Sequence, residues 1–194
     1  MKVFDRKITL ASQSPRRSRL LREAGFDFEV KTREIDESYP NHLPPAAVAE
    51  YIANNKAEGC RDLRSPDHVL LTADTIVVFD NRIYGKPKNE ADAIRILLEL
   101  AGQTHHVITG VCLLDEKKKV IFHDVSEVQF DPLTEEEAHY YVRTCRPLDK
   151  AGAYGAQEWM GHCKVSQIKG SYANIMGLPV HRVYRRMHEF IAAD

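Results

Sequence analysis

Residues 68–79 place the strongest constraint on what this chain can fold into. Two runs of large apolar residues, at 69–71 and 76–79, flank the segment Thr-Ala-Asp-Thr at 72–75. Continuous apolar runs of this kind are typical of a strand buried on both faces of a sheet. The stretch therefore predicts one central strand that helices cover on both sides.

Asp74 is unusual in such a strand, because an ionised carboxylate there costs several kcal/mol unless it meets a cation or hydrogen-bond donors. A polar residue that breaks an otherwise consistent segment indicates a functional site. The alternative is a turn that splits two shorter strands and exposes Asp74. Thr and Ala are poor turn residues compared with Gly, Asn or Pro, which favours the continuous strand.

The N-terminal segment predicts a strand, a turn and a helix in close succession. Apolar residues at 8–11 predict the strand, and Pro15 then begins a helix with Ser14 as its N-cap and Gly25 at its end. Unpaired N–H groups at the start of a helix bind anions. Hydroxyl and guanidinium groups beside them suit a phosphate chain. The residues that supply these groups are Ser12, Arg16 and Arg17. The alternative is that the arginines form a solvated helix face.

Two lysines also occupy positions that need an explanation. Lys56 follows Ile52 by four residues, on the inward stripe of a helix that begins near Pro45. Either its ammonium reaches a cleft or a partner, or it extends to the helix edge. Lys86 precedes a proline, which favours an extended backbone and a fixed direction for the side chain.

Strands and helices alternate along the rest of the chain, which predicts the α/β class. Further strands are expected at 26–30, 106–114 and 120–130, and further helices are expected after Asn89, after Thr134 and from Pro179. The tight turn at 80–82 favours a mixed sheet over an all-parallel one. No repeat or linker interrupts the chain, so residues 1–194 are expected to form a single domain.

Composition excludes several classes of protein. A formal charge of −1 provides no global field that would recruit nucleic acid or an anionic membrane. No apolar run approaches the roughly 20 residues of a membrane span, and the N-terminus lacks the apolar core of a signal peptide. The four cysteines are scattered, which favours reduced thiols over disulfides or a zinc site. We therefore expect a cytoplasmic protein.

Six motifs occur in order over nearly the whole chain: SQSPRR at 12–17, ADT at 73–75, GKP at 85–87, GQTH at 102–105, LDKAGAYG at 148–155 and GSY at 170–172. Together they resemble the Maf family of nucleoside triphosphate pyrophosphatases. The resemblance implies a mixed twisted sheet flanked by helices, with two lobes around a central cleft, as in ITPase-like enzymes. Within the family, GQTH and DKAGAYG are similar to the dTTP/UTP pyrophosphatase branch.

The resemblance implies hydrolysis of dTTP and UTP to the monophosphate and pyrophosphate, assisted by a divalent metal, Mg²⁺ or Mn²⁺. Asp74 would accept the proton of water and, with Glu37 and in second place Asp36, would help hold the metal. Positive charge and hydrogen-bond donors for the phosphates would come from Ser12, Arg16, Arg17, Lys56 and Lys86. Base selection would fall to Arg16, Thr75 and Gln157. The family also implies a homodimer.

The chain departs from the family pattern in a few places. Thr72 stands where a glycine commonly precedes ADT, Gln13 replaces a smaller residue, and residues 158–162 are bulkier than the expected glycine-rich segment. The last change adjoins Gln157, so it affects the expected base preference more than catalysis. Two alternatives therefore stay open: a pyrophosphatase of the 7-methyl-GTP type, and a non-catalytic nucleotide-binding regulator of cell division.

Overall fold

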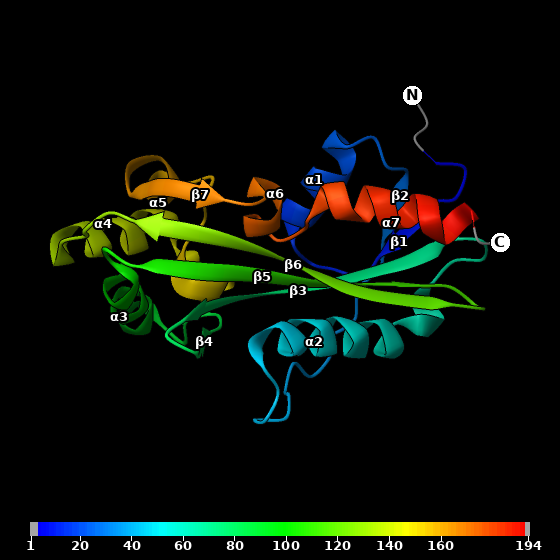
Figure 1. The fold of residues 1–194 in the computed structure, drawn as a ribbon, viewed down its shortest axis with the longest axis horizontal. Helices are drawn as coiled ribbons and strands as arrows, with labels where there is room; N and C mark the ends of the chain where they lie inside the picture. Colours follow the sequence, from blue (N-terminus) through cyan, green and yellow to red (C-terminus); the bar gives the residue numbers. More distant parts are fainter. Residues whose placement is uncertain (1–3, 193–194) are drawn as a thin grey trace. The chain divides into compact units, whose positions relative to one another are not determined.

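A computed structural model describes residues 4–192 of the chain. Its centre is a 7-stranded sheet with the order β2-β1-β3-β5-β6-β7, and β4 pairs with β3 (Figure 1). The strands are β1 (Ile8–Leu10), β2 (Phe28–Val30), β3 (Val69–Phe79), β4 (Arg82–Tyr84), β5 (Thr104–Leu114), β6 (Lys119–Phe130) and β7 (Val165–Lys169).

The sheet is mixed, as the sequence predicts. β1 is parallel to both β2 and β3, whereas β4 is antiparallel to β3 and β7 is antiparallel to β6. β3 is one continuous strand through the segment at 72–75, so the alternative of a turn at that point is wrong. Asp74 is only 8% exposed, which confirms that a carboxylate interrupts a buried strand.

Helices alternate with these strands along most of the chain. They are α1 (Pro15–Glu23), α2 (Pro45–Gly59), α3 (Glu90–Leu100), α4 (Glu135–Cys145), α5 (Trp159–Cys163), α6 (Tyr172–Ile175) and α7 (Val180–Ala192). Short 3₁₀ turns occupy Arg61–Leu63, Pro147–Asp149 and Ala151–Ala153. In the part of the chain that the structure describes, no helix is long and apolar enough to cross a membrane.

Two of the predicted helix starts are confirmed in detail. The Asn89 side chain accepts a hydrogen bond from the Asp92 amide at 2.9 Å, and Thr134 forms a capping box with Glu137. Ser14 does occupy the N-cap position of α1, but its side chain makes no capping hydrogen bond. Ser12 supplies the hydroxyl instead and accepts from the Ser14 amide at 3.2 Å, because the turn folds back on itself there.

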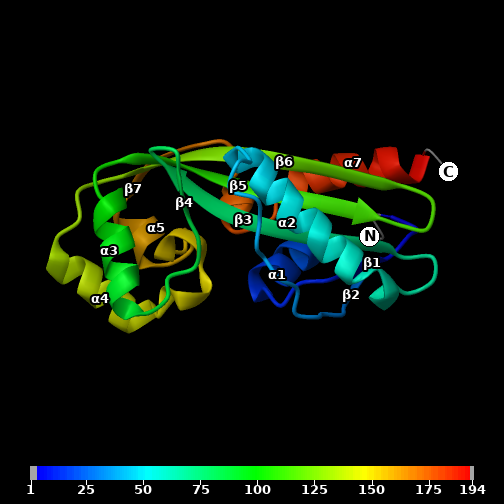
Figure 2. The ribbon, with the colours of Figure 1, turned by 90° about the horizontal axis from the view of Figure 1, so that it is seen from below.

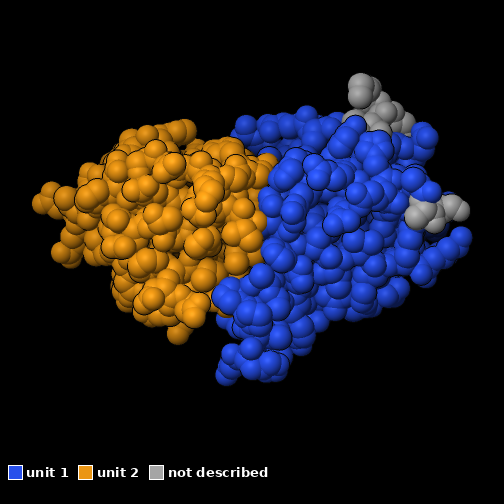
Figure 3. Space-filling model, viewed as in Figure 1, with its two compact units in different colours: residues 1–74, 109–124, 177–194 blue, residues 75–108, 125–176 orange. Residues whose placement is uncertain are grey.

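Residues of the chain divide into two compact units (Figure 3). Unit 1 comprises residues 1–74, 109–124 and 177–194, and unit 2 comprises residues 75–108 and 125–176. β3, β5 and β6 each contribute residues to both units. Each unit has a core of its own, built around α2 in unit 1 and around α3 and α4 in unit 2.

Within unit 1, helices cover both faces of the strands. The chain passes from β1 to β2 and then returns past β1 to β3, so right-handed crossovers place α1 and α2 on opposite faces. Figures 1 and 2 show α2 on one face and α1 and α7 on the other. The turn that follows β1 and the start of α1 therefore lie beside the strand that carries Asp74.

Candidate active site

Three predicted site residues of unit 1 meet at one ammonium group. Lys56 Nζ donates to Asp74 Oδ1 at 2.7 Å and lies 2.7 Å from Glu37 Oε1. The three residues come from α2, from β3 and from the loop between β2 and α2. Lys56 can therefore occupy an inward position and Asp74 a buried one, because the ion pair between them offsets the cost of burying each charge.

Close packing of α2 on the sheet brings Lys56 to Asp74. Thr72 lies two residues before Asp74 on β3, and its hydroxyl donates to the Ala53 carbonyl at 2.6 Å. On the neighbouring strand, a Cβ added to Gly110 would stand 2.2 Å from the Ala49 carbonyl oxygen, so only glycine allows this approach. Thr72, which departs from the family pattern, thus binds α2 to β3 one helical turn before Lys56.

The turn after β1 lies beside this ion-pair cluster. Arg17 donates through Nη1 to Ser12 Oγ at 3.1 Å and through Nε to the Gly177 carbonyl at 2.7 Å. Burial lowers the pKa of Arg17, and the nearby charge of Asp74 acts in the opposite direction. Arg16 and Glu37 also lie close enough for their charges to act on that pKa. A guanidinium stays protonated in proteins, so unit 1 gathers fixed positive charge around a carboxylate pair.

The other predicted residues, Thr75, Lys86 and Gln157, belong to unit 2. The Gly152 amide donates to the Gly85 carbonyl at 3.1 Å, which places the segment at 150–157 against the segment that carries Lys86. Gly152 has φ of +68°, and an added Cβ would stand 2.6 Å from a Val77 methyl group on β3. The 3₁₀ turn at Ala151–Ala153, which precedes Gln157, is thus packed tightly between β3 and Gly85.

Gln157 has an unsatisfied polar atom. Its Oε1 is buried and has no hydrogen-bond partner among the described residues. Buried side-chain oxygens are normally paired, so an orphaned one requires an explanation. An acceptor held in this way is suited to a ligand that brings its own N–H donor.

His105, in the GQTH motif, contacts the segment at 150–157 through Tyr154. Its Nε2 lies 2.8 Å from the Tyr154 hydroxyl, and both side chains are buried. Burial lowers the pKa of His105 to about 3, so the imidazole is neutral at neutral pH. Sequence reasoning used His105 only as part of a motif, because a neutral buried histidine has no local signature.

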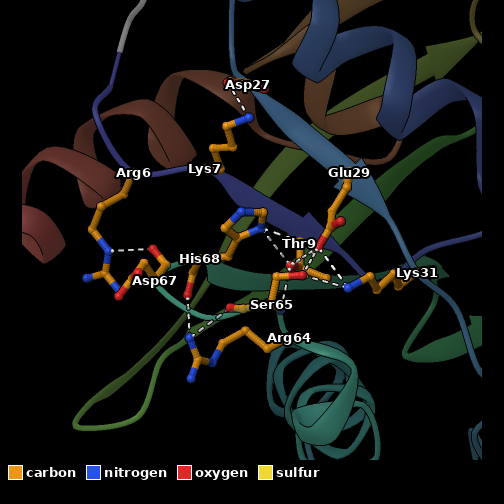
Figure 4. A network of polar contacts seen from close by, with 10 residues as sticks. All are labelled: Arg6, Lys7, Thr9, Asp27, Glu29, Lys31, Arg64, Ser65, Asp67 and His68. Carbon is orange, nitrogen blue, oxygen red and sulfur yellow. Dashed lines mark hydrogen bonds and ion pairs between the residues drawn. The ribbon is translucent and has the colours of Figure 1, made fainter.

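A second polar network in unit 1 contains none of the predicted site residues (Figure 4). The Glu29 carboxylate accepts hydrogen bonds from Ser65 and Thr9, and Lys31 lies 3.1 Å away. These contacts, with the Ser65 hydroxyl first, lower the pKa of Glu29 to about 2. The network joins β1 and β2 to the loop before β3, the strand that carries Asp74.

The carboxylates of the candidate site suit a metal ion that takes its other ligands from phosphate. Among residues 4–192, no group of three or more His, Cys, Asp or Glu side chains could hold a metal ion. Mg²⁺ commonly uses one or two carboxylates and takes its other ligands from phosphates and waters. Asp74 and Glu37 fit that description, whereas the Asp36 carboxylate accepts from the Ser38 amide at 2.9 Å and from its hydroxyl at 2.6 Å. All four cysteines are free thiols.

Comparison with known proteins identifies the family. The family model described as Maf-like protein matches residues 7–190 of this chain. This chain belongs to the Maf-like family. Within that family it is similar to proteins named dTTP/UTP pyrophosphatase. The protein from Phocaeicola vulgatus is 50% identical over 93% of this chain and 94% of its own length, and the one from Bacteroides thetaiotaomicron is 47% identical over 92% and 93%.

A solved structure shares the fold of this Maf-like chain at low sequence identity. The Ham1 protein of Staphylococcus aureus matches with a TM-score of 0.55 and 13% identity, over 95% of this chain and 99% of that one. The likeness confirms the predicted fold class of a mixed sheet flanked by helices.

Proposed function

We propose that this Maf-like protein is a nucleoside triphosphate pyrophosphatase that hydrolyses dTTP and UTP to the monophosphate and pyrophosphate. The observation that carries the proposal is the buried Asp74 carboxylate, paired with Lys56 and lying beside Arg17 and Ser12. Relatives named dTTP/UTP pyrophosphatase at 40–50% identity support the same activity.

In the proposed reaction, the oxygen of a water molecule bonds to the α-phosphorus and its proton passes to the Asp74 carboxylate. The bond between the α-phosphorus and the bridging oxygen breaks, and pyrophosphate leaves with the electron pair. Carboxylates are weak bases at neutral pH. Neutralisation of phosphate charge must therefore supply much of the barrier reduction.

The cationic and hydrogen-bonding side chains have distinct proposed roles. Lys56, which contacts both carboxylates, orients Asp74 toward the water. Phosphate oxygens are the proposed partners of Ser12, Arg16, Arg17 and Lys86. Asp74 and Glu37 would hold Mg²⁺ or Mn²⁺, which would stabilise negative charge on the phosphates when bound.

Gln157 is the proposed reader of the base, together with Thr75 and Arg16. Uracil and thymine present an N3–H donor, and the buried Gln157 Oε1 lacks one. Cytosine has an acceptor at N3, so it would leave that oxygen unpaired. One methyl group discriminates by only about 1–3 kcal/mol, so activity on both uracil and thymine is expected.

The test is pyrophosphate release from UTP, dTTP, CTP and 7-methyl-GTP, each with Mg²⁺ or Mn²⁺ and without metal. We expect metal-dependent release of pyrophosphate and monophosphate, with kcat/KM for UTP and dTTP well above that for CTP and 7-methyl-GTP, and turnover slower by at least about 10²-fold in the Asp74→Asn variant. Preferred hydrolysis of 7-methyl-GTP would support the other branch of the family. Tight nucleotide binding without any product would support a regulator. Release of orthophosphate would indicate cleavage of a different bond.

Two further properties are proposed with the activity. A nucleoside triphosphate substrate is consistent with a cytoplasmic enzyme, and the family resemblance implies a homodimer. Fractionation of cells that produce the tagged protein tests the first property. Light scattering of the purified protein tests the second.

A further inference from the structure

Glu158, which follows Gln157 and departs from the family pattern, lies in a polar cluster inside unit 2. Its Oε1 lies 3.1 Å from Lys150 Nζ, and its Oε2 accepts a hydrogen bond from the Tyr141 hydroxyl. Lys150 is only 8% exposed and also lies 2.7 Å from Asp149. A charged group that is buried to this degree is costly to leave unpaired, so Glu158 has a defined position.

The Tyr141 hydroxyl joins both sides of Gln157. It accepts a hydrogen bond from the Gly155 amide at 3.0 Å and donates to Glu158. Tyr141 is fully buried on α4, and its pKa is raised by burial and by the adjacent Glu158 carboxylate. The neutral Tyr141 hydroxyl thus both accepts and donates a hydrogen bond. These two bonds fix the backbone at Gly155, two residues before Gln157, and the side chain of Glu158, one residue after it.

The Gln157 amide and the Glu158 carboxylate converge over Gly155. A Cβ added to Gly155 would stand 2.9 Å from Gln157 Nε2 and 3.0 Å from Glu158 Oε2. Both groups therefore lie against the same side of Gly155. Behind them, α5 packs closely enough that a Cβ on Gly161 would stand 1.7 Å from the Ala156 carbonyl oxygen.

We propose that Glu158 is a positioning residue for base selection: through Lys150 and Tyr141 it holds the Gln157 amide in the orientation that presents Oε1 to the N3–H of uracil or thymine. The inference rests on the proposed function of Gln157. It assigns a role to a side chain that stands where the family pattern has a smaller one.

The test compares Glu158→Gln and Tyr141→Phe with the wild type. Steady-state kcat and KM for UTP and CTP are measured by pyrophosphate release, and thermal unfolding of each variant is recorded. Tyr140→Phe is the matched control, because Tyr140 is the neighbouring residue of α4, is 45% exposed and contacts Trp159 through its ring. Loss of its hydroxyl leaves the cluster intact.

We expect both test variants to raise KM for UTP by about tenfold, with a smaller fall in kcat, and to lower the UTP/CTP ratio of kcat/KM by a similar factor. Tyr140→Phe should match the wild type. In a Gln157→Ala background, Glu158→Gln should cause no further loss of selectivity, because the amide that it positions is absent.

Unchanged KM and unchanged UTP/CTP ratio in Glu158→Gln would overturn the inference, whatever happens to thermal stability. Additive effects of Glu158→Gln and Gln157→Ala would overturn it as well. If Tyr141→Phe fails to fold, the Glu158→Gln measurement decides alone. A wild-type protein without activity on UTP and dTTP would instead overturn the proposed function, and this inference with it.

Discussion

The two units hold their candidate residues by different forces. In unit 1, ion pairs dominate: Lys56 contacts Asp74 and Glu37, and Arg17 lies within their field. In unit 2, the ion pair of Lys150 and Glu158 is joined by neutral hydrogen bonds and close packing, as in the pair His105 and Tyr154 and in the approach of Gly152 to Val77.

This difference matches what each set of residues is proposed to bind. A triphosphate is a polyanion, and its attraction to a cation is weak in bulk water. Cations that the protein holds in fixed positions, with water excluded, bind its charge more strongly. A pyrimidine base is neutral, so shape and the placement of donors and acceptors select it. We therefore expect substitutions of the charged site residues of unit 1 to act on kcat, and substitutions around Gln157 in unit 2 to act on stability and selectivity.

The largest expected effect comes from Asp74→Asn. The variant keeps the shape of the side chain but cannot accept the proton, so kcat should fall by at least about 10²-fold. Asp124→Asn is the matched control in the same unit, because Asp124 pairs with Arg182 at 3.3 Å and has no proposed role in catalysis. Near-normal turnover of folded Asp74→Asn would remove the carboxylate from the mechanism.

Gly152→Ala should destabilise the protein strongly, since the new Cβ would overlap the Val77 side chain in addition to the strain of a positive φ. Overpacking of this kind costs about 1–3 kcal/mol. Gly102→Ala is the control, because Gly102 has φ of +69° but nothing within 4 Å of an added Cβ. Urea unfolding measures both variants, and equal losses would show that backbone strain alone matters.

His105 should make unfolding depend on pH. Burial lowers its pKa to about 3, below the model-peptide value of 6.5, so between these values the unfolded chain binds a proton that the folded chain excludes. The free energy of unfolding should therefore fall as pH decreases below 6.5, by up to about 1.4 kcal/mol per pH unit from this group. Urea unfolding from pH 7 to pH 5 should show a shallower dependence for His105→Asn than for the wild type. Identical slopes would contradict the assignment.

The smallest expected effect comes from Thr72→Val. The variant removes the hydrogen bond to the Ala53 carbonyl while keeping the side-chain shape, which should lower the free energy of unfolding by about 1 kcal/mol. Thr144→Val is the control, because the exposed Thr144 hydroxyl also donates to a backbone carbonyl, that of Tyr140 at 2.7 Å. Water can replace the lost bond at Thr144 but not at Thr72. Equal stability losses in the two variants would argue against a role of Thr72 in holding α2.

Much of the fold could be predicted because local patterns determine the type of each element. The apolar runs of β3, the Asn89 cap of α3 and the capping box of α4 each depend on residues a few positions apart. Between residues 158 and 176 the sequence pattern predicts no helix or strand, whereas the structure has α5, β7 and α6 there. These elements are short and their burial is irregular, so they lack a clear hydrophobic period.

The sequence by itself determined the family, the α/β class and a buried carboxylate that needed a cation. Only the tertiary structure decided that the cation is Lys56, that Glu37 shares it, and that His105 is neutral beneath Tyr154. The physical reason is that periodicity records which face of an element is buried. Which polar groups meet depends on contacts such as Thr72 with Ala53, between segments far apart in the chain.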